Sequence, residues 1–207
     1  FLAMEEAGPG SAQQLTHAIV PRPGAGLTSS VIFFLSALKG GDLRSWLGEN
    51  SLRLIARSRP NIVGRIREDF TTLSRMADEP ASGDWRVALI PINTGAEIEQ
   101  IRLLLRQNDE ETDEDATSDT RFIIDVGLSR FGRLQLDGLV RDKGKSLDLI
   151  VRSDAHLADT MQNDIRTIFV EAADLTGLKG GVNFQAAPAD FINIPDPSSD
   201  HDVGLMV

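Results

Sequence analysis

Three segments between residues 121 and 152 alternate apolar and polar side chains, and this pattern constrains the fold more than any other feature of the chain. The apolar positions are Phe122, Ile124, Val126 and Leu128, then Leu134 and Leu136, then Leu147, Leu149 and Val151. Because strand side chains point alternately to two faces, each segment predicts a strand with one apolar face. The links between them, residues 129–132 and 142–145, are short enough for hairpins, so an antiparallel meander is expected.

An amphipathic run follows the third predicted strand. Its apolar residues recur at helical spacing and are Leu157, Met161, Ile165, Ile168, Phe169, Ala172 and Leu175. Asp154 can cap this helix and Gly177 can end it, which gives roughly 22 residues and a length of about 33 Å. After a turn at Gly180-Gly181, a last strand carries Val182, Phe184 and Ala186. The β-β-β-α-β order predicts an α+β fold, an antiparallel sheet covered on one face by a long helix.

Additional strands are expected N-terminal to this core. Trp85, Val87 and Leu89 alternate with other residues before Pro91, which predicts a strand ending near the proline. The run from Ile98 to Gln107 fits either a helix or a strand, and periodicity does not decide between them.

A small helical subdomain is expected before the strands, over residues 28–79. An apolar helix ends at Gly40-Gly41, Asp42 caps a second helix, residues 51–58 form a third, and Pro60 opens a fourth. Residues 1–27 are rich in glycine and proline and predict a flexible lead, and residues 189–207 predict a flexible polar tail. The α+β domain is expected to span residues 84–188.

Composition excludes several classes of function. The net charge of −10 disfavours sequence-independent nucleic-acid binding, which needs clustered Lys and Arg. The chain has no cysteine, which rules out disulfides, thiolate nucleophiles and cysteine zinc sites. Its longest apolar stretch, residues 31–38, is much shorter than the roughly 20 residues of a transmembrane helix. We therefore expect no membrane insertion.

No pattern in the chain predicts a cofactor or a metal site. His17, His156 and His201 are far apart and lack partners at ligand spacing. A calcium loop counted from Asp113 would need glycine at its sixth position and glutamate at its twelfth, where Ser118 and Ile124 stand. The acidic run is therefore interpreted as a solvated loop.

Two further groups of residues leave alternatives open. Asp125, Asp137 and Asp148 are expected on the solvated sheet face, where paired carboxylates could serve a small hydrolase. Trp46 and Phe131 could each anchor a protein interface, although packing into the core is the ordinary interpretation of both.

The segment from Leu128 to Leu136 resembles the Gly-centred loop and strand in the C-terminal domain of bacterial flagellar hook-length control proteins. The resemblance covers roughly residues 84–188 and includes the strand ending at Pro91, the following strands, the long helix and the last strand. In that family the segment equivalent to Ile98–Gln107 is a strand. The family loop usually has a Pro-x-x-Leu-Gly-like core, whereas this chain has Phe131 before Gly132.

The resemblance implies a non-enzymatic protein-interaction module with no catalytic residues. The chain is expected to be a monomer. Its partner would be a component of the flagellar export gate, and contact would switch the substrate specificity of type III export. The expected contact residues are Leu128, Phe131, Gly132 and Arg133. The protein would act in the bacterial cytoplasm or be exported by the flagellar route. The alternatives are a carboxylate-dependent hydrolase on the open sheet face and a structural or assembly scaffold.

Overall fold

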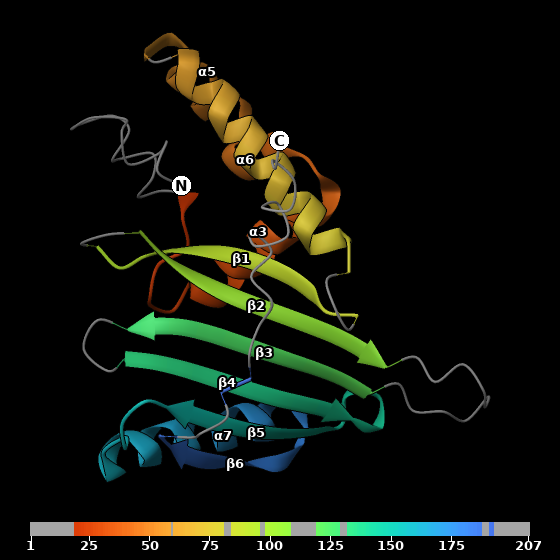
Figure 1. Cartoon of the computed structure of the whole chain (residues 1–207), viewed down its shortest axis with the longest axis vertical. Helices are drawn as coiled ribbons and strands as arrows, with labels where there is room; N and C mark the ends of the chain where they lie inside the picture. Colours follow the sequence, from red (N-terminus) through yellow and green to blue (C-terminus); the bar gives the residue numbers. More distant parts are fainter. Residues whose placement is uncertain are drawn as a thin grey trace, which may run out of the picture. The chain divides into compact units, whose positions relative to one another are not determined.

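The computed structural model describes residues 19–58, 60–80, 84–95, 98–108, 119–128, 132–187 and 191–192 (Figure 1). It contains helices and a six-stranded, mostly antiparallel sheet, so the predicted α+β class is confirmed. The described residues form two compact units. One holds those up to Pro80 together with Val87–Ile101, and the other holds the remainder.

In the described part of the predicted helical segment there are four helices. They are α3 (Leu27–Gly40), α4 (Leu43–Leu47), α5 (Glu49–Ser58) and α6 (Pro60–Asp78). The side chain of Asp42 accepts a hydrogen bond from the backbone N–H of Arg44 at 2.9 Å, so the predicted cap of α4 is confirmed. Gly41 follows α3 in the left-handed conformation, with φ of 62°.

Three aromatic rings form the centre of the helical core. The ring of Trp46 meets that of Phe34 edge-on at 4.8 Å between centroids and stacks on that of Phe70 at 5.8 Å. Trp46 is only 6% exposed, so it is a core residue, and its alternative interpretation as an interface anchor is wrong. Aromatic residues bury large apolar areas, which lets a short helical segment of this kind form a core.

Ser74 joins α6 to the end of α3. Its buried hydroxyl donates to the carbonyl oxygen of Leu38 at 2.7 Å. We expect Ser74→Ala to lower the free energy of unfolding by about 1–2 kcal/mol, because a buried hydrogen bond is lost. Ser36→Ala is the matched control, since the exposed Ser36 hydroxyl donates only to Ile32 within its own helix, and its loss should change stability by less than about 0.5 kcal/mol. Urea unfolding followed by tryptophan fluorescence measures the stability of both variants. Equal losses of stability would show that the hydrogen bond between Ser74 and Leu38 does not stabilise the protein.

The sheet has the strand order β1-β2-β3-β4-β5-β6. The strands are β1 (Arg86–Asn93), β2 (Ile98–Asn108), β3 (Asp119–Leu128), β4 (Gly132–Arg141), β5 (Ser146–Ser153) and β6 (Lys179–Ala186). The pairs β2–β3, β3–β4 and β4–β5 are antiparallel, which confirms the predicted meander. Ile98–Gln107 is part of a strand, as the family resemblance implied.

The last strand departs from the predicted antiparallel arrangement. β6 pairs with β5 in parallel, because the chain crosses over the sheet through α7 (Asp159–Thr176) before it returns. Gly180 and Gly181 lie inside β6 and pair with Leu147 and Asp148, so the turn predicted at this glycine pair is wrong. The change of direction comes earlier, at Gly177, which ends α7 with φ of 70° as predicted.

Helix α7 covers one face of the C-terminal strands, as predicted (Figure 1). The buried centre is Leu149, Val151 and Leu157. The half-buried side chains that pack on it come from β3, β4, α7 and β6 and are Phe122, Leu134, Leu136, Met161, Ile165, Phe169, Val182 and Phe184. The alternating residues of the meander thus meet the helical repeat of α7 in one apolar layer.

Two details of the predicted helix are wrong. α7 begins at Asp159 rather than near Asp154, and its N-cap, Ala158, makes no side-chain capping bond. Ile168 and Leu175 are 65% and 88% exposed, although the helical spacing predicts both on the apolar side of the helix. One residue of an α-helix turns by about 100°, so Ile168 lies well round from Phe169, which packs on the sheet.

Both predicted flexible ends include residues with defined contacts. Val20 is 3% exposed, and the carbonyl oxygen of Pro21 accepts a hydrogen bond from the N–H of Asn93 at 2.8 Å. Ordered structure therefore begins before residue 28. Residues 1–18, the acidic run at 109–118 and residues 193–207 lie outside the described part of the chain. Phe191 and Ile192 of the expected tail contact Arg133 and Gln135 of β4.

Candidate functional site

The sheet face opposite α7 carries a set of charged and polar side chains, here called the polar face. Its members are Arg121 and Asp125 of β3, Arg133, Gln135 and Asp137 of β4, Arg152 of β5 and Gln185 of β6. The register explains the grouping, because Gln135 lies opposite both Asp125 and Arg152. Directly opposed residues of paired strands point to the same side of a sheet.

The polar face is much less solvated than its residue types suggest. Gln135 is 0% exposed, Asp137 5%, Asp125 7% and Arg152 9%. The prediction that Asp125 and Asp137 lie on a solvated surface is therefore wrong. Asp148, with 46% of its side chain exposed, is the one of the three predicted carboxylates that is well exposed, and it pairs with Arg141. Burial of the other two requires partners, since an unpaired buried charge is strongly unfavourable.

Asp137 is held by two arginines. The Nε and NH2 groups of Arg121 donate to its two carboxylate oxygens at 2.9 and 2.8 Å, and NH1 of Arg152 donates to Oδ2 at 2.9 Å. Burial alone would raise the pKa of Asp137, but the hydrogen bonds and charges of the two arginines outweigh it and hold that pKa below its ordinary value. Arg152 also donates through Nε to Gln185 Oε1 at 3.0 Å, which fixes its guanidinium.

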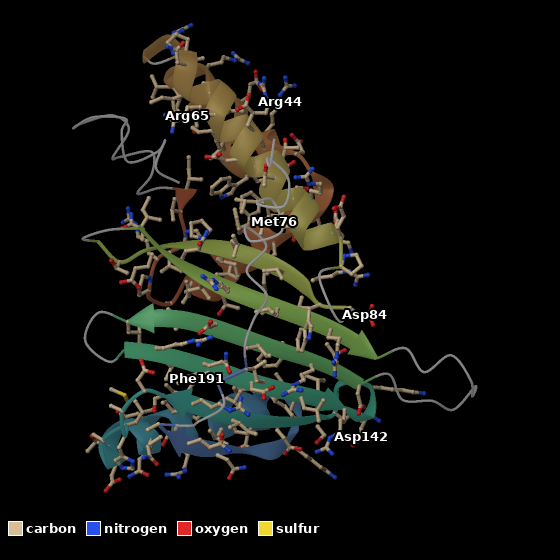
Figure 2. All side chains as sticks on the ribbon, in the orientation of Figure 1. Arg44, Arg65, Met76, Asp84, Asp142 and Phe191 are labelled. Atoms are coloured by element: carbon tan, nitrogen blue, oxygen red, sulfur yellow. The ribbon has the colours of Figure 1, made fainter. Side chains whose placement is uncertain are left out.

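Asp125 makes a second two-bond pair. Arg133 donates to its two oxygens at 2.9 and 3.0 Å, and this contact raises the pKa of Arg133. The guanidinium carbon of Arg133 also lies 4.8 Å from the centre of the Phe191 ring, a cation–π contact. Figure 2 labels Phe191 near β4.

Gln135 binds the backbone next to Phe191. Its side-chain amide donates to the carbonyl oxygen of Ile192 at 3.1 Å, and its carbonyl oxygen accepts from the N–H of Ile192 at 3.0 Å. A carboxamide has the same donor and acceptor as a peptide group. Gln135 therefore serves Ile192 as a neighbouring strand would, from the middle of the polar face.

Three of the four predicted contact residues, Leu128, Gly132 and Arg133, lie at the β3–β4 hairpin. The fourth, Phe131, lies outside the described residues. Leu128 ends β3 and pairs with Gly132, which has φ of 75°. A Cβ on Gly132 would lie 2.5 Å from Oδ2 of Asp154.

Asp154 accepts a hydrogen bond from the backbone N–H of Arg133. It therefore fixes the hairpin instead of capping α7. The side chain of Arg133 belongs to the polar face, which connects the predicted contact loop to that face.

A small cavity of about 110 Å³ lies beside α7 and β6, among residues that include Ser153, His156 and Gln162. The Ser153 hydroxyl donates to the carbonyl oxygen of Ala155 at 2.7 Å, and His156 Nε2 lies 3.8 Å from Asp159 Oδ1. The bond from Ser153 to the Ala155 carbonyl does not activate the hydroxyl as a nucleophile, because activation requires a base that accepts its proton. Within the ranges that the structure describes, no group of three His, Cys, Asp or Glu side chains could hold a metal ion.

Sequence reasoning missed the residues that organise the polar face, namely Arg121, Gln135, Arg152, Phe191 and Ile192. A signal was present, since arginine and aspartate occupy the same face of adjacent predicted strands.

None of the helices in the described ranges has the length and apolar character needed to cross a bilayer. No protein-family model, curated protein or solved structure matches the chain.

Proposed function

We propose that this chain is a non-enzymatic protein-interaction module that switches the substrate specificity of bacterial flagellar type III export by contacting an export-gate protein. The resemblance of residues 84–188 to hook-length control proteins suggests the system. The observation that carries the interaction role is the polar face, where Gln135 and Arg133 already hold a peptide segment through its backbone and an aromatic ring.

The arrangement of the carboxylates disfavours the hydrolase alternative. A general base needs a free lone pair and a pKa near the working pH. Asp137 instead accepts three hydrogen bonds from two arginines, and its pKa is lowered. Asp125 has both oxygens bonded to Arg133. These contacts support a structural role for both residues, in which they orient arginines for binding.

A protein can switch the export gate only if its affinities for the two arrangements of the gate differ. The module would bind one arrangement of the export gate more tightly than the other and so shift the balance between them. The hairpin residues Leu128, Phe131, Gly132 and Arg133 form the proposed contact. Arg133 is central, because its backbone is anchored by Asp154 and its side chain by Asp125.

The test combines genetics and binding. Deletion of the gene in its own flagellated bacterium should give overlong hooks without filaments, and the purified chain should bind the cytoplasmic part of the export-gate protein. Arg133→Ala should weaken that binding about tenfold or more, as for a central interface residue. Arg141→Ala is the matched control on the same strand and face, since Arg141 pairs only at the surface with Asp148 among the contacts described. Normal flagella after deletion, or equal effects of the two variants, would refute the proposal.

A further inference from the structure

The contact between Gln135 and Ile192 joins residues 57 positions apart in the sequence. Gln135 is fully buried, and burial of a side-chain amide is unfavourable unless both its donor and its acceptor are bonded. Ile192 satisfies both with one peptide unit. The polar face therefore has a group suited to an extended backbone, and this group does not depend on the side chain of the residue it binds.

Arg133 adds a preference for the neighbouring residue. Its guanidinium is fixed by two hydrogen bonds to Asp125 and lies over the Phe191 ring at 4.8 Å. A cation held in place by a carboxylate loses little freedom when an aromatic ring packs on it. Together, Arg133 and Gln135 contact an aromatic ring and the backbone of the residue that follows it.

The charge of the polar face favours an acidic segment. Arg121, Arg133 and Arg152 outnumber Asp125 and Asp137 on this face. In the sequence, Asp190 directly precedes Phe191, and Asp196 follows four residues after Ile192. The segment that contacts this face thus belongs to an acidic stretch.

We propose that the polar face is a binding site for an extended acidic segment with an aromatic–aliphatic pair, and that Phe191-Ile192 occupies this site in cis. A segment of the same chemistry on a partner protein would displace it. This inference goes beyond the proposed function and holds whether or not the partner belongs to a flagellar system. The cis segment competes at high effective concentration because it is tethered shortly after β6. Free segments should therefore bind the intact chain weakly.

The test uses a fluorescein-labelled peptide with the sequence of residues 188–195, titrated with the full chain and followed by anisotropy. Phe191→Ala in the full chain removes the cation–π contact of the cis segment and leaves the polar face unchanged. We expect the peptide to bind this variant at least about tenfold more tightly than it binds the unmodified chain. Failure of the peptide to bind the variant would overturn the proposal.

Changes in the peptide test recognition without any risk to folding. N-methylation at the position of Ile192 removes the N–H that donates to Gln135, and replacing the phenylalanine with alanine removes the ring over Arg133. Each should weaken binding to the Phe191→Ala chain about tenfold. Binding that is indifferent to both changes would overturn the proposed site. Sedimentation of the unmodified chain should show a monomer; a dimer that Phe191→Ala dissociates would show exchange between copies and overturn occupancy in cis.

Discussion

Replacement of Asp137 with asparagine is expected to lower the free energy of unfolding by about 3–5 kcal/mol. Asparagine keeps the shape of the side chain and removes the charge that Arg121 and Arg152 share. The side chain of Arg152 is 10% exposed, so its guanidinium would remain largely buried without an opposite charge. Removal of one partner from a buried ion pair is costly for this reason. Urea unfolding followed by circular dichroism gives the difference in free energy of unfolding between the unmodified chain and the variant.

Asp148→Asn is the control on the same sheet face. Asp148 and Arg141 are 46% and 45% exposed, and an exposed ion pair contributes about 0–1 kcal/mol. The two variants remove the same chemical group from strands of one sheet and differ in burial. Equal losses of stability would show that the burial of Asp137 does not govern its contribution.

The contribution of Asp137 to the free energy of unfolding should also depend on pH. Its folded pKa is lowered, so the ion pair stabilises the protein fully above the ordinary aspartate pKa of about 3.9 and loses this effect as pH falls through the lower folded value. The stability difference between the unmodified chain and Asp137→Asn should therefore narrow below about pH 4. A difference that stays constant from pH 7 to pH 3 would contradict this account.

The fold could be predicted from the sequence where its cause is local. Alternation of side chains defines β3, β4 and β5, and short links impose their antiparallel order. The parallel pairing of β6 follows from the crossover, but the glycine pair inside the strand resembled a turn. Gly180 and Gly181 can be assigned to the strand only when the register between β5 and β6 is known.

The polar face depends on register and on distant contacts, which the sequence pattern does not show. Asp137 lies opposite Ile123 and Ile150, and its partners Arg121 and Arg152 are their second neighbours along β3 and β5. Such diagonal contacts reach across a sheet only when the register is fixed. Alternation alone places Asp137 on the face away from α7 and does not reveal that it is buried and bonded to two arginines.

Substitution of Gly180 by alanine is expected to destabilise the protein by about 3 kcal/mol, because two effects combine at this residue. Gly180 has φ of 140°, a conformation that residues with a Cβ rarely adopt. A Cβ there would also lie 1.9 Å from the backbone carbonyl oxygen of Leu147, its partner in β5. Backbone cannot rotate away as a side chain can, so the first residues of β6 would have to separate from β5.

The adjacent Gly181 gives a matched comparison within the same strand. It has no positive φ, and a Cβ built on it meets no atom within 4 Å. Gly181→Ala should change the free energy of unfolding by less than about 0.5 kcal/mol. Thermal and urea unfolding of the two variants measure the difference. A Gly180→Ala protein as stable as Gly181→Ala would show that β6 does not pair with β5 at Leu147, and the parallel arrangement of these strands would then be wrong at its first residues.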